Sequence, residues 1–181
     1  MGSLSKLFPK KDGERHGPFE MYHENGQLES KGNYKDEKLD GLLELYYENG
    51  QLKAKGNYKD GQRHGPFEMY HENDQLKAKG TYKDEKLHGF CELYYENGQL
   101  EKKGTLKDGE RHGPFEQYHE NGQLEKKGTD KDGHLDGLYE FYHQNGQLKD
   151  KGTFNMGEKC GEWIEDGKTV TYDPCPDCDD E

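Results

Sequence analysis

Residues 20–34 read EMYHENGQLESKGNY, and this stretch decides the fold because close copies of it recur every 24 residues. Its central Asn-Gly-Gln-Leu begins at positions 25, 49, 97, 121 and 145, and Asn-Asp-Gln-Leu begins at position 73. A longer period of 48 residues lies on top of the first, because Arg-His-Gly-Pro-Phe-Glu occurs at 15–20, 63–68 and 111–116. The sequence therefore predicts six full repeats over 13–156, arranged as three pairs of unlike repeats.

Each repeat has the pattern of a β-hairpin. Asn25-Gly26 lies between two runs of alternating apolar and polar residues, and Asn-Gly is the strongest short signal for a two-residue type I′ turn. Such a turn places Glu20 opposite Lys31 and Tyr22 opposite Glu29. The Glu–Lys pair recurs in all six repeats, and opposite charges that face each other across two strands stabilise the register by roughly a few tenths of a kcal/mol.

The other side of each hairpin is expected to be the packed one. Phe19 falls opposite Gly32, whose missing side chain leaves room for the ring over the backbone. Leu28 shares this side, and its equivalents in the other repeats are all leucines. Glycine interrupts every repeat and the alternation has a period of two, so helices are not expected.

The predicted fold is all-β: an elongated array of stacked antiparallel hairpins, with 24-residue repeats and a 48-residue super-period, in a single twisted sheet with a groove. Residues 1–12 are expected to be an N-terminal extension. Residues 157–172 contain the only Trp, Ile and Val of the chain and are expected to form a degenerate capping hairpin that closes the stack. Residues 173–181 are expected to be an acidic, disordered tail.

The composition restricts both the core and the partners. Only 28% of the residues are hydrophobic, so a conventional two-layer core is excluded, and no apolar run approaches the ~20 residues of a membrane-spanning helix. The chain has 26 basic and 38 acidic residues, a net charge of −12, which disfavours nucleic acid and anionic membranes as partners. With four cysteines and no secretory signal, we expect a cytoplasmic protein with reduced thiols.

Catalytic and metal sites are not expected. His16, His64 and His112 recur at the 48-residue step, which separates them by about 20 Å, far more than ligands of one metal allow. Cys175 and Cys178 have the spacing of half a zinc site, and Cys160 adds at most a third thiolate where a structural zinc needs four ligands. No nucleophile and base stand apart from the repeat itself, so we expect no enzyme activity and no cofactor.

Two columns of residues are candidate partner-binding positions, because tyrosine and arginine are enriched at protein interfaces. The tyrosines share a side of the hairpins with the Glu–Lys pairs, and they are Tyr22, Tyr46, Tyr70, Tyr94, Tyr118 and Tyr142. The arginines lie near the strand starts of every second repeat, and they are Arg15, Arg63 and Arg111. The alternative for the tyrosines is that their rings only pack between neighbouring hairpins.

The repeat resembles the MORN repeat, and more narrowly the bacterial MORN variant of the YwqK-type antitoxin group. The shared pattern is Glu20-x-Tyr22-x-x-Asn25-Gly26-x-Leu28-x-x-Lys31-Gly32-x-Tyr34, then a return turn and a His-Gly such as His64-Gly65. The resemblance covers about 13–166. It implies an elongated, twisted antiparallel sheet with a groove along one side, and a role as an interaction or scaffold module. Later repeats depart from the pattern, because the position of Tyr34 becomes Leu106 and then Asp130.

The expected function is a non-catalytic protein-binding module, most concretely an antitoxin- or immunity-like neutraliser that covers the active surface of a protein partner such as a toxin. The alternative is a structural scaffold that associates with itself through its end strands, which makes the chain a monomer or an end-to-end homodimer. An acidic mimic of nucleic acid is a third hypothesis, weakened because acidic residues alternate with lysines in every repeat.

Overall fold

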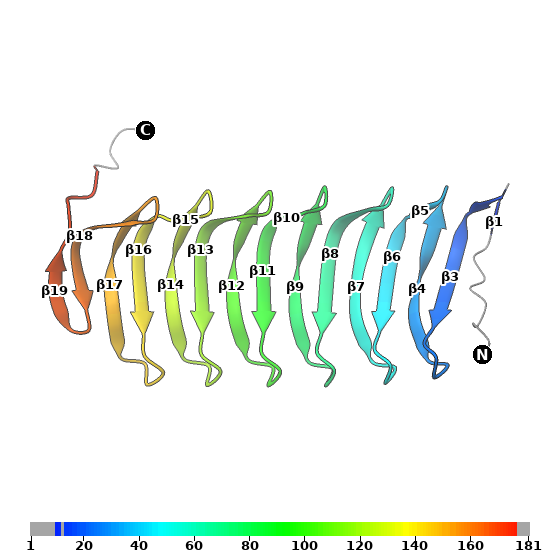
Figure 1. Ribbon diagram of the computed structural model, residues 1–181, viewed down its shortest axis with the longest axis horizontal. Coiled ribbons are helices and arrows are strands. Elements are labelled where there is room, and N and C mark those ends of the chain that lie inside the picture. The colour runs from blue at the N-terminus through cyan, green and yellow to red at the C-terminus, as the bar shows by residue number, and fades with distance from the viewer. Residues whose placement is uncertain (1–9, 12, 177–181) are drawn as a thin grey trace. The chain divides into compact units, whose positions relative to one another are not determined.

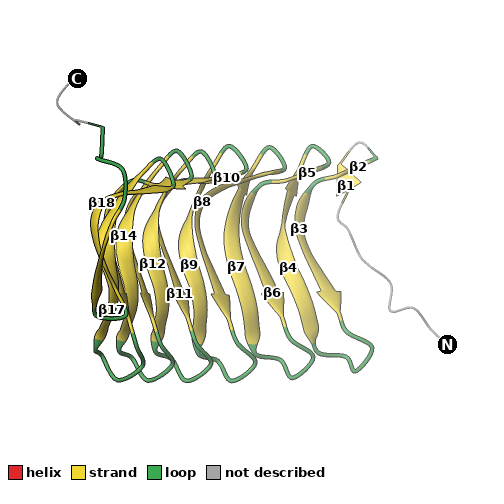
Figure 2. Ribbon diagram, turned by 60° about the vertical axis from the view of Figure 1, so that its left-hand side comes forward, coloured by secondary structure: helices red, strands yellow, loops and turns green. Residues whose placement is uncertain are grey.

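A computed structural model describes residues 10–11 and 13–176. The chain divides between His88 and Gly89 into two compact units, and each unit is considered by itself. The described residues form strands and turns but no helix, so the predicted all-β fold is confirmed (Figure 1, Figure 2). Within the same residues there is no helix with the length and apolar character needed to cross a membrane.

The first unit is an antiparallel sheet in which one hairpin follows another along the chain (Figure 1). Its strands are β1 Lys10–Lys11, β2 Glu14–Arg15, β3 Gly17–Tyr22, β4 Leu28–Lys35, β5 Lys38–Leu39, β6 Gly41–Tyr46, β7 Leu52–Lys59, β8 Gln62–Tyr70, β9 Leu76–Lys83 and β10 Lys86–Leu87. They pair in the order β3–β4–β6–β7–β8–β9. The short strands β5 and β10 extend the return turns, and β1 pairs with β2 separately.

The second unit repeats this arrangement. Its strands are β11 Gly89–Tyr94, β12 Leu100–Lys107, β13 Glu110–Tyr118, β14 Leu124–Lys131, β15 His134–Leu135, β16 Gly137–Tyr142, β17 Leu148–Asn155, β18 Glu158–Glu165 and β19 Lys168–Thr171. The pairing order is β11–β12–β13–β14–β16–β17–β18–β19, and every pair is antiparallel. In both units the turns lie beyond the two ends of the strands (Figure 2).

The hairpin connections differ from the predicted two-residue turns. The Gly26 amide donates a hydrogen bond to His23 O at 2.9 Å, and the His23 amide donates one to Gln27 O at 2.8 Å. Only the glycine of Asn25-Gly26 has a positive φ, at 85°, whereas a type I′ turn needs positive φ at both residues. The connection is a three-residue loop, a type I turn closed by a glycine bulge, and the Asn25 side chain supports it by accepting from the Gln27 amide at 3.0 Å.

This loop changes the register next to the turn. Tyr22 faces Leu28, not Glu29 as predicted, because the three-residue loop shifts the pairing beside the turn by one residue. A second bulge, at Glu29 of β4, leaves that residue without a partner and restores the predicted register from Met21 and Ser30 onward. The same irregularity lies before the equivalent tyrosine of the other hairpins, at Tyr46, Tyr70, Tyr94, Tyr118 and Tyr142. The side on which each tyrosine lies is unchanged, since its own strand alternates without interruption.

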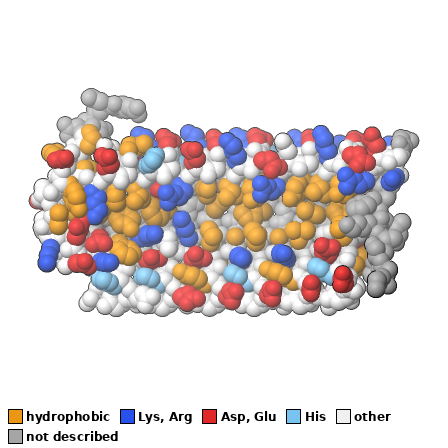
Figure 3. All heavy atoms as spheres, in the orientation of Figure 1, with side chains coloured by type: hydrophobic (Ala, Val, Ile, Leu, Met, Phe, Trp, Pro, Cys, Tyr) orange, Lys and Arg blue, Asp and Glu red, His pale blue; other side chains and the backbone are white. Residues whose placement is uncertain are grey.

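Beyond the bulge the predicted register is confirmed, since Glu20 faces Lys31 and Phe19 faces Gly32. Neighbouring residues of a strand point to opposite sides, so these two pairs define two faces of the sheet. We call the side with Glu20, Lys31 and their equivalents the glutamate face, and the side with Phe19, Gly32 and their equivalents the aromatic face. Figure 3 shows one face of the molecule, on which hydrophobic side chains form a band across the strands of each unit.

The core is thin and lies on the aromatic face, where aromatic rings cover glycines. A Cβ atom added to Gly32 would lie 2.9 Å from Phe19 Cε1 and 3.1 Å from Leu43 Cδ1. In the second unit a Cβ on Gly128 would lie 3.1 Å from Phe115 Cε1. The predicted ring-over-glycine packing is therefore present, and it lets a single sheet bury large rings without a second layer.

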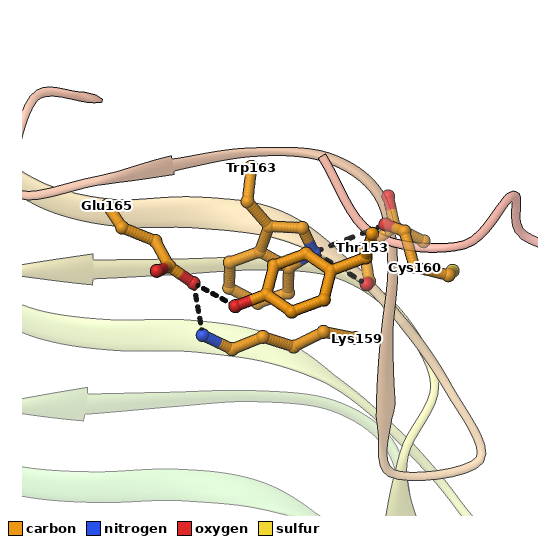
Figure 4. Close-up of polar contacts among 6 residues, drawn as sticks. Thr153, Lys159, Cys160, Trp163 and Glu165 are labelled. Atoms are coloured by element: carbon orange, nitrogen blue, oxygen red, sulfur yellow. Dashed lines mark hydrogen bonds and ion pairs between the residues drawn. The ribbon is translucent and has the colours of Figure 1, made fainter. Parts of the chain in front are cut away.

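The last hairpin, β18–β19, has the largest buried side chain among the described residues. Trp163 is only 1% exposed, and its indole N–H donates to Thr153 O and to Cys160 O, each at 3.2 Å (Figure 4). The ammonium of Lys159 lies 4.4 Å from the centre of the indole ring and 2.5 Å from Glu165 Oε1. Burying a tryptophan with its N–H satisfied stabilises this last hairpin.

A disulfide bond joins Cys160 to Cys175, so the expectation of reduced thiols is wrong for these two residues. The chain after β19 turns back toward the start of β18, where the Gly161 amide donates to Asp173 O at 2.8 Å. This return brings the two sulfurs together and ties part of the expected disordered tail, up to Cys175, to the sheet. The remaining tail residues 177–181, with Cys178, lie outside the described residues.

Candidate protein-binding surfaces

The candidate tyrosines lie on the glutamate face and bind the glutamate two residues earlier. The Tyr94 hydroxyl donates to Glu92 Oε2 at 2.9 Å. The same contact joins Tyr22 to Glu20, Tyr70 to Glu68, Tyr118 to Glu116 and Tyr142 to Glu140. Hydrogen bonding to Glu20 is the main cause that raises the pKa of Tyr22, so the phenol stays protonated and keeps donating.

Within each unit, lysines connect neighbouring hairpins on this face. Lys31 Nζ lies 2.7 Å from Glu44 Oε2, and it lies 5.7 Å from the centre of the Tyr46 ring. Equivalent contacts are Lys55–Glu68 at 2.7 Å, Lys103–Glu116 at 2.8 Å and Lys127–Glu140 at 2.7 Å. At these positions the ion pair joins two neighbouring hairpins, because Lys31 faces Glu20 on one side and Glu44 on the other. Lys151 keeps the expected contact within its own hairpin, 3.0 Å from Glu140 Oε1.

These contacts favour the alternative in which most tyrosine rings pack between hairpins. Tyr46, Tyr70, Tyr118 and Tyr142 are half-buried, and a lysine of the preceding hairpin lies over or beside the rings of the first three. Tyr22 differs, since it is 48% exposed. It borders a hollow of about 710 Å³ whose lining includes Pro18, Asn33 and Leu42.

The candidate arginines lie on the opposite, aromatic face. The guanidinium carbon of Arg15 lies 4.5 Å from the centre of the Tyr34 ring, and Arg15 Nε lies 2.7 Å from Glu37 Oε2. Arg63 makes the same two contacts, with Tyr82 at 4.4 Å and Glu85 at 3.3 Å. The nine candidate residues therefore divide between two faces and do not form one site.

The third arginine has a different environment. At the 48-residue step, Asp130 stands where the two earlier copies have Tyr34 and Tyr82. Gly133 stands where they have Glu37 and Glu85. Arg111 Nε lies 3.7 Å from Asp130 Oδ2, and an Arg111 terminal nitrogen donates to Gly133 O at 3.0 Å. Asp130 is 2% exposed, and burial is the main cause that raises the pKa of its carboxyl, in opposition to the nearby Arg111.

An apolar pocket on the aromatic face of the first unit escaped the sequence analysis. It has a volume of about 220 Å³ and lies over Gly56, between Leu43 and Leu45 on one side and Phe67 and Met69 on the other. A Cβ on Gly56 would meet only Phe67 Cβ, at 3.4 Å, so this glycine is not covered as Gly32 is. The 48-residue period is the signal that indicates the pocket, because it places different side chains opposite successive glycines. Phe19 faces Gly32, whereas Leu43 faces Gly56.

Metal coordination finds no support in the described part of the chain. No group of three or more His, Cys, Asp or Glu side chains is placed to hold an ion there. His23 and His119 instead contact the backbone of the next hairpin, with Nε2 3.0 Å from Tyr46 O and 3.2 Å from Tyr142 O. Cys160 and Cys175 are bonded to each other, so neither is a thiolate ligand.

Together, the stacked hairpins and the lysine contacts between them define a protein of tandem β-hairpin repeats. The family described as "MORN repeat variant" matches residues 15–36, 39–60, 63–84, 87–108, 111–129 and 135–156, which together make up most of the chain. The chain belongs to this family. MORN repeats are generally modules that bind proteins or membranes.

Other comparisons add little to this assignment. No match was found among the curated proteins. Among solved structures, the one titled "Crystal Structure of TarM" is similar at 10% identity and a TM-score of 0.35, over 56% of this chain and 19% of that one. The chain thus spans less than a fifth of the length of that protein.

Proposed function

We propose that this chain is a non-catalytic protein-binding module that acts as an antitoxin- or immunity-like neutraliser, by covering the active surface of a protein partner. The observation that carries the proposal is the aromatic face of the first unit, which combines an open apolar pocket with arginines stacked on tyrosines. Met69 at this pocket is 39% exposed, and Arg63 keeps 45% of its side chain exposed. Exposed apolar side chains beside arginine and tyrosine are typical of interface centres.

The charge of the chain supports a protein partner over a membrane. A net charge of −12 repels anionic lipid headgroups and nucleic acid phosphates. It attracts basic or mixed protein surfaces and speeds their encounter. A neutraliser benefits from this steering, since it must reach its target before the target acts.

A self-associating scaffold is the second candidate, and a sheet edge favours it. Among the described strands, β19 pairs only with β18, so its other edge can accept a further strand. Sedimentation of the purified chain separates the candidates, because a scaffold forms concentration-dependent assemblies without any partner.

The test of the first candidate uses the protein encoded beside this chain as the binding partner. Leu45→Glu and Met69→Glu place a carboxylate at the pocket over Gly56, and we expect each to weaken binding by tenfold or more in calorimetry and to abolish rescue of growth. The matched control is Leu138→Glu on the glutamate face of the second unit, where Leu138 is 52% exposed. Equal losses in the control and the pocket variants would contradict binding through the aromatic face.

A further inference from the structure

The Asn-Gly pairs of the hairpin turns, at 25, 49, 97, 121 and 145, are open to a covalent rearrangement. Glycine has no side chain to shield its backbone nitrogen from the asparagine before it. When that nitrogen loses its proton to solvent, it can attack the asparagine Cγ, the bond from Cγ to Nδ2 breaks, and ammonia leaves. Water then opens the resulting succinimide ring to aspartate or isoaspartate. The dipeptide is the same at all five positions, so the contacts of each turn determine which one reacts.

Three of these turns lie in the second unit, and inside each loop the same hydrogen bonds hold the asparagine. Oδ1 of Asn97, Asn121 and Asn145 accepts from the amide two residues later, at 2.9, 3.0 and 3.0 Å. The amide of the following glycine donates to the carbonyl three residues earlier, at 2.9, 2.8 and 2.9 Å. These contacts oppose the reaction equally at the three positions and do not rank them.

The asparagine Nδ2 atom distinguishes the three turns. The first two asparagines donate to a backbone carbonyl of the next turn, Asn97 to Glu120 O at 3.1 Å and Asn121 to Gln144 O at 2.9 Å. Asn145 Nδ2 donates instead to Gln147 Oε1, at 3.2 Å, within its own exposed loop. A carbonyl fixed in the next hairpin restrains the asparagine more than a glutamine side chain that keeps most of its rotational freedom.

Asn145 lacks a carbonyl of the next turn because the last hairpin is short. β17 pairs with β18 only as far as Asp150 and Glu165, and the Asp166 amide donates to Lys149 O at 2.9 Å. The turn between β18 and β19 is therefore level with Lys149. The loop of Asn145 extends beyond it (Figure 1).

This loop is also more exposed than the one before it. His143 and Leu148 are exposed, whereas their equivalents His119 and Leu124 are half-buried. The described chain after β19 runs to the opposite end of β18, where it is bonded to Cys160, and does not cover the loop. Solvent therefore reaches the turn of Asn145 on the side where the other turns meet a neighbour.

We propose that Asn145 is the preferred deamidation site of this chain. To react, its side chain must rotate toward the nitrogen of Gly146, and only a bond to Gln147 opposes this rotation in addition to the contacts that all the turns share. The product replaces a neutral amide with a carboxylate, and isoaspartate also lengthens the main chain at the turn. This inference goes beyond the proposed binding function and does not depend on it.

The experiment incubates the folded full chain in mildly alkaline buffer and follows deamidation by mass spectrometry of tryptic peptides. Each Asn-Gly pair lies in a different tryptic peptide, so the five rates are measured separately. We expect Asn145 to react about fivefold faster than Asn121, the effect of one net hydrogen bond. Asn49 should react at an intermediate rate, because its Nδ2 lies 3.5 Å from Glu72 O.

The same chain unfolded in urea is the control for local sequence. Residues 118–124 and 142–148 differ only at Glu120 and Gln144, so both sites should then react at similar rates. Gln147→Ala removes the remaining acceptor and should raise the rate at Asn145 in the folded protein. The matched variant Gln99→Ala should leave the rate at Asn97 unchanged, because Asn97 binds Glu120 O.

Similar rates at Asn145 and Asn121 in the folded protein would overturn the proposal, as would a folded chain that does not react at Asn145. The same excess at Asn145 in urea would assign the difference to local sequence, against the proposal. An unchanged rate at Asn145 in Gln147→Ala would show that the Nδ2 bond does not control the reaction.

Discussion

Lys127 Nζ lies 2.7 Å from Oε2 of Glu140, a residue of the following hairpin and not of its own. Lys151 holds the other carboxylate oxygen, Oε1, at 3.0 Å. The Glu140 side chain is only 9% exposed, so the two lysines offset much of its desolvation. Hydrogen bonding to Lys127 is the main cause that lowers the pKa of Glu140 to about 2.

This carboxylate makes stability depend on pH. The folded pKa lies below the value of about 4.3 for an unfolded glutamate, so the stabilisation is fully present above pH ~5 and is lost as pH falls toward 2. We expect Glu140→Gln to lower the free energy of unfolding by about 2 kcal/mol at pH 7 and by much less at pH 2.5. Urea unfolding at both pH values measures this, with the exposed Glu158→Gln as the control. Equal losses at the two pH values would contradict the ion-pair account.

Two glycines on the aromatic face should respond oppositely to the same substitution. A Cβ on Gly152 would overlap the indole ring of Trp163, whereas a Cβ on Gly56 would make one ordinary contact with Phe67 at 3.4 Å. We expect Gly152→Ala to destabilise the protein by roughly 1–3 kcal/mol through overpacking, and Gly56→Ala to be neutral or slightly stabilising. Denaturation midpoints decide between the outcomes, and similar midpoints for both variants would refute the ring-over-glycine packing at Gly152.

The disulfide between Cys160 and Cys175 should stabilise the last hairpin of the second unit. The bond closes a segment with a sequence separation of 15 residues, and closing a loop of that length contributes about 3 kcal/mol in the chain-entropy account. We expect dithiothreitol to lower the melting temperature of the unaltered protein. Cys175→Ser should melt at the reduced temperature with or without the reductant, and a variant that melted like the oxidised protein would show that the bond contributes nothing.

Asp130 should affect stability in the opposite sense to Glu140. Burial raises the pKa of this carboxyl above its usual value, so the ionised form destabilises the folded state and the cost disappears as pH falls through the folded pKa. We expect Asp130→Asn to raise the free energy of unfolding at pH 7 by about 1 kcal/mol, with no gain at pH 3. Asp132→Asn, at a side chain 64% exposed, is the control. A loss of stability at pH 7 would show that the contact with Arg111 outweighs the desolvation.

Much of the fold could be predicted because each repeat contains its own register signals. Glu20 faces Lys31 and Phe19 faces Gly32 in the structure as in the prediction, since strand alternation and the glycine opposite a ring are local properties of the chain. The turn was predicted wrongly because Asn-Gly suits two loops of different length. The choice between them depends on whether Asn25 adopts a positive φ, which the dipeptide does not decide.

The candidate sites were predictable as columns but not as surfaces. A spacing of 24 residues places the six tyrosines in one row, and their side of the sheet follows from alternation. It does not say that Lys31 bonds to Glu44 and not to Glu20, because that choice compares two carboxylates on different hairpins. The pocket over Gly56 likewise depends on which way Leu43 and Phe67 lean.

The sequence by itself determined that this protein is a stack of β-hairpins, that Glu20 and Lys31 share one face, and that Gly32 receives the ring of Phe19. These follow from period, alternation and side-chain size, and each involves residues close in the chain. The tertiary structure alone decided which hairpin each lysine serves, that Cys160 meets Cys175, and that Asp130 is buried. Each of these outcomes depends on the relative placement of segments that the sequence separates, and such placement is settled only when the strands pack.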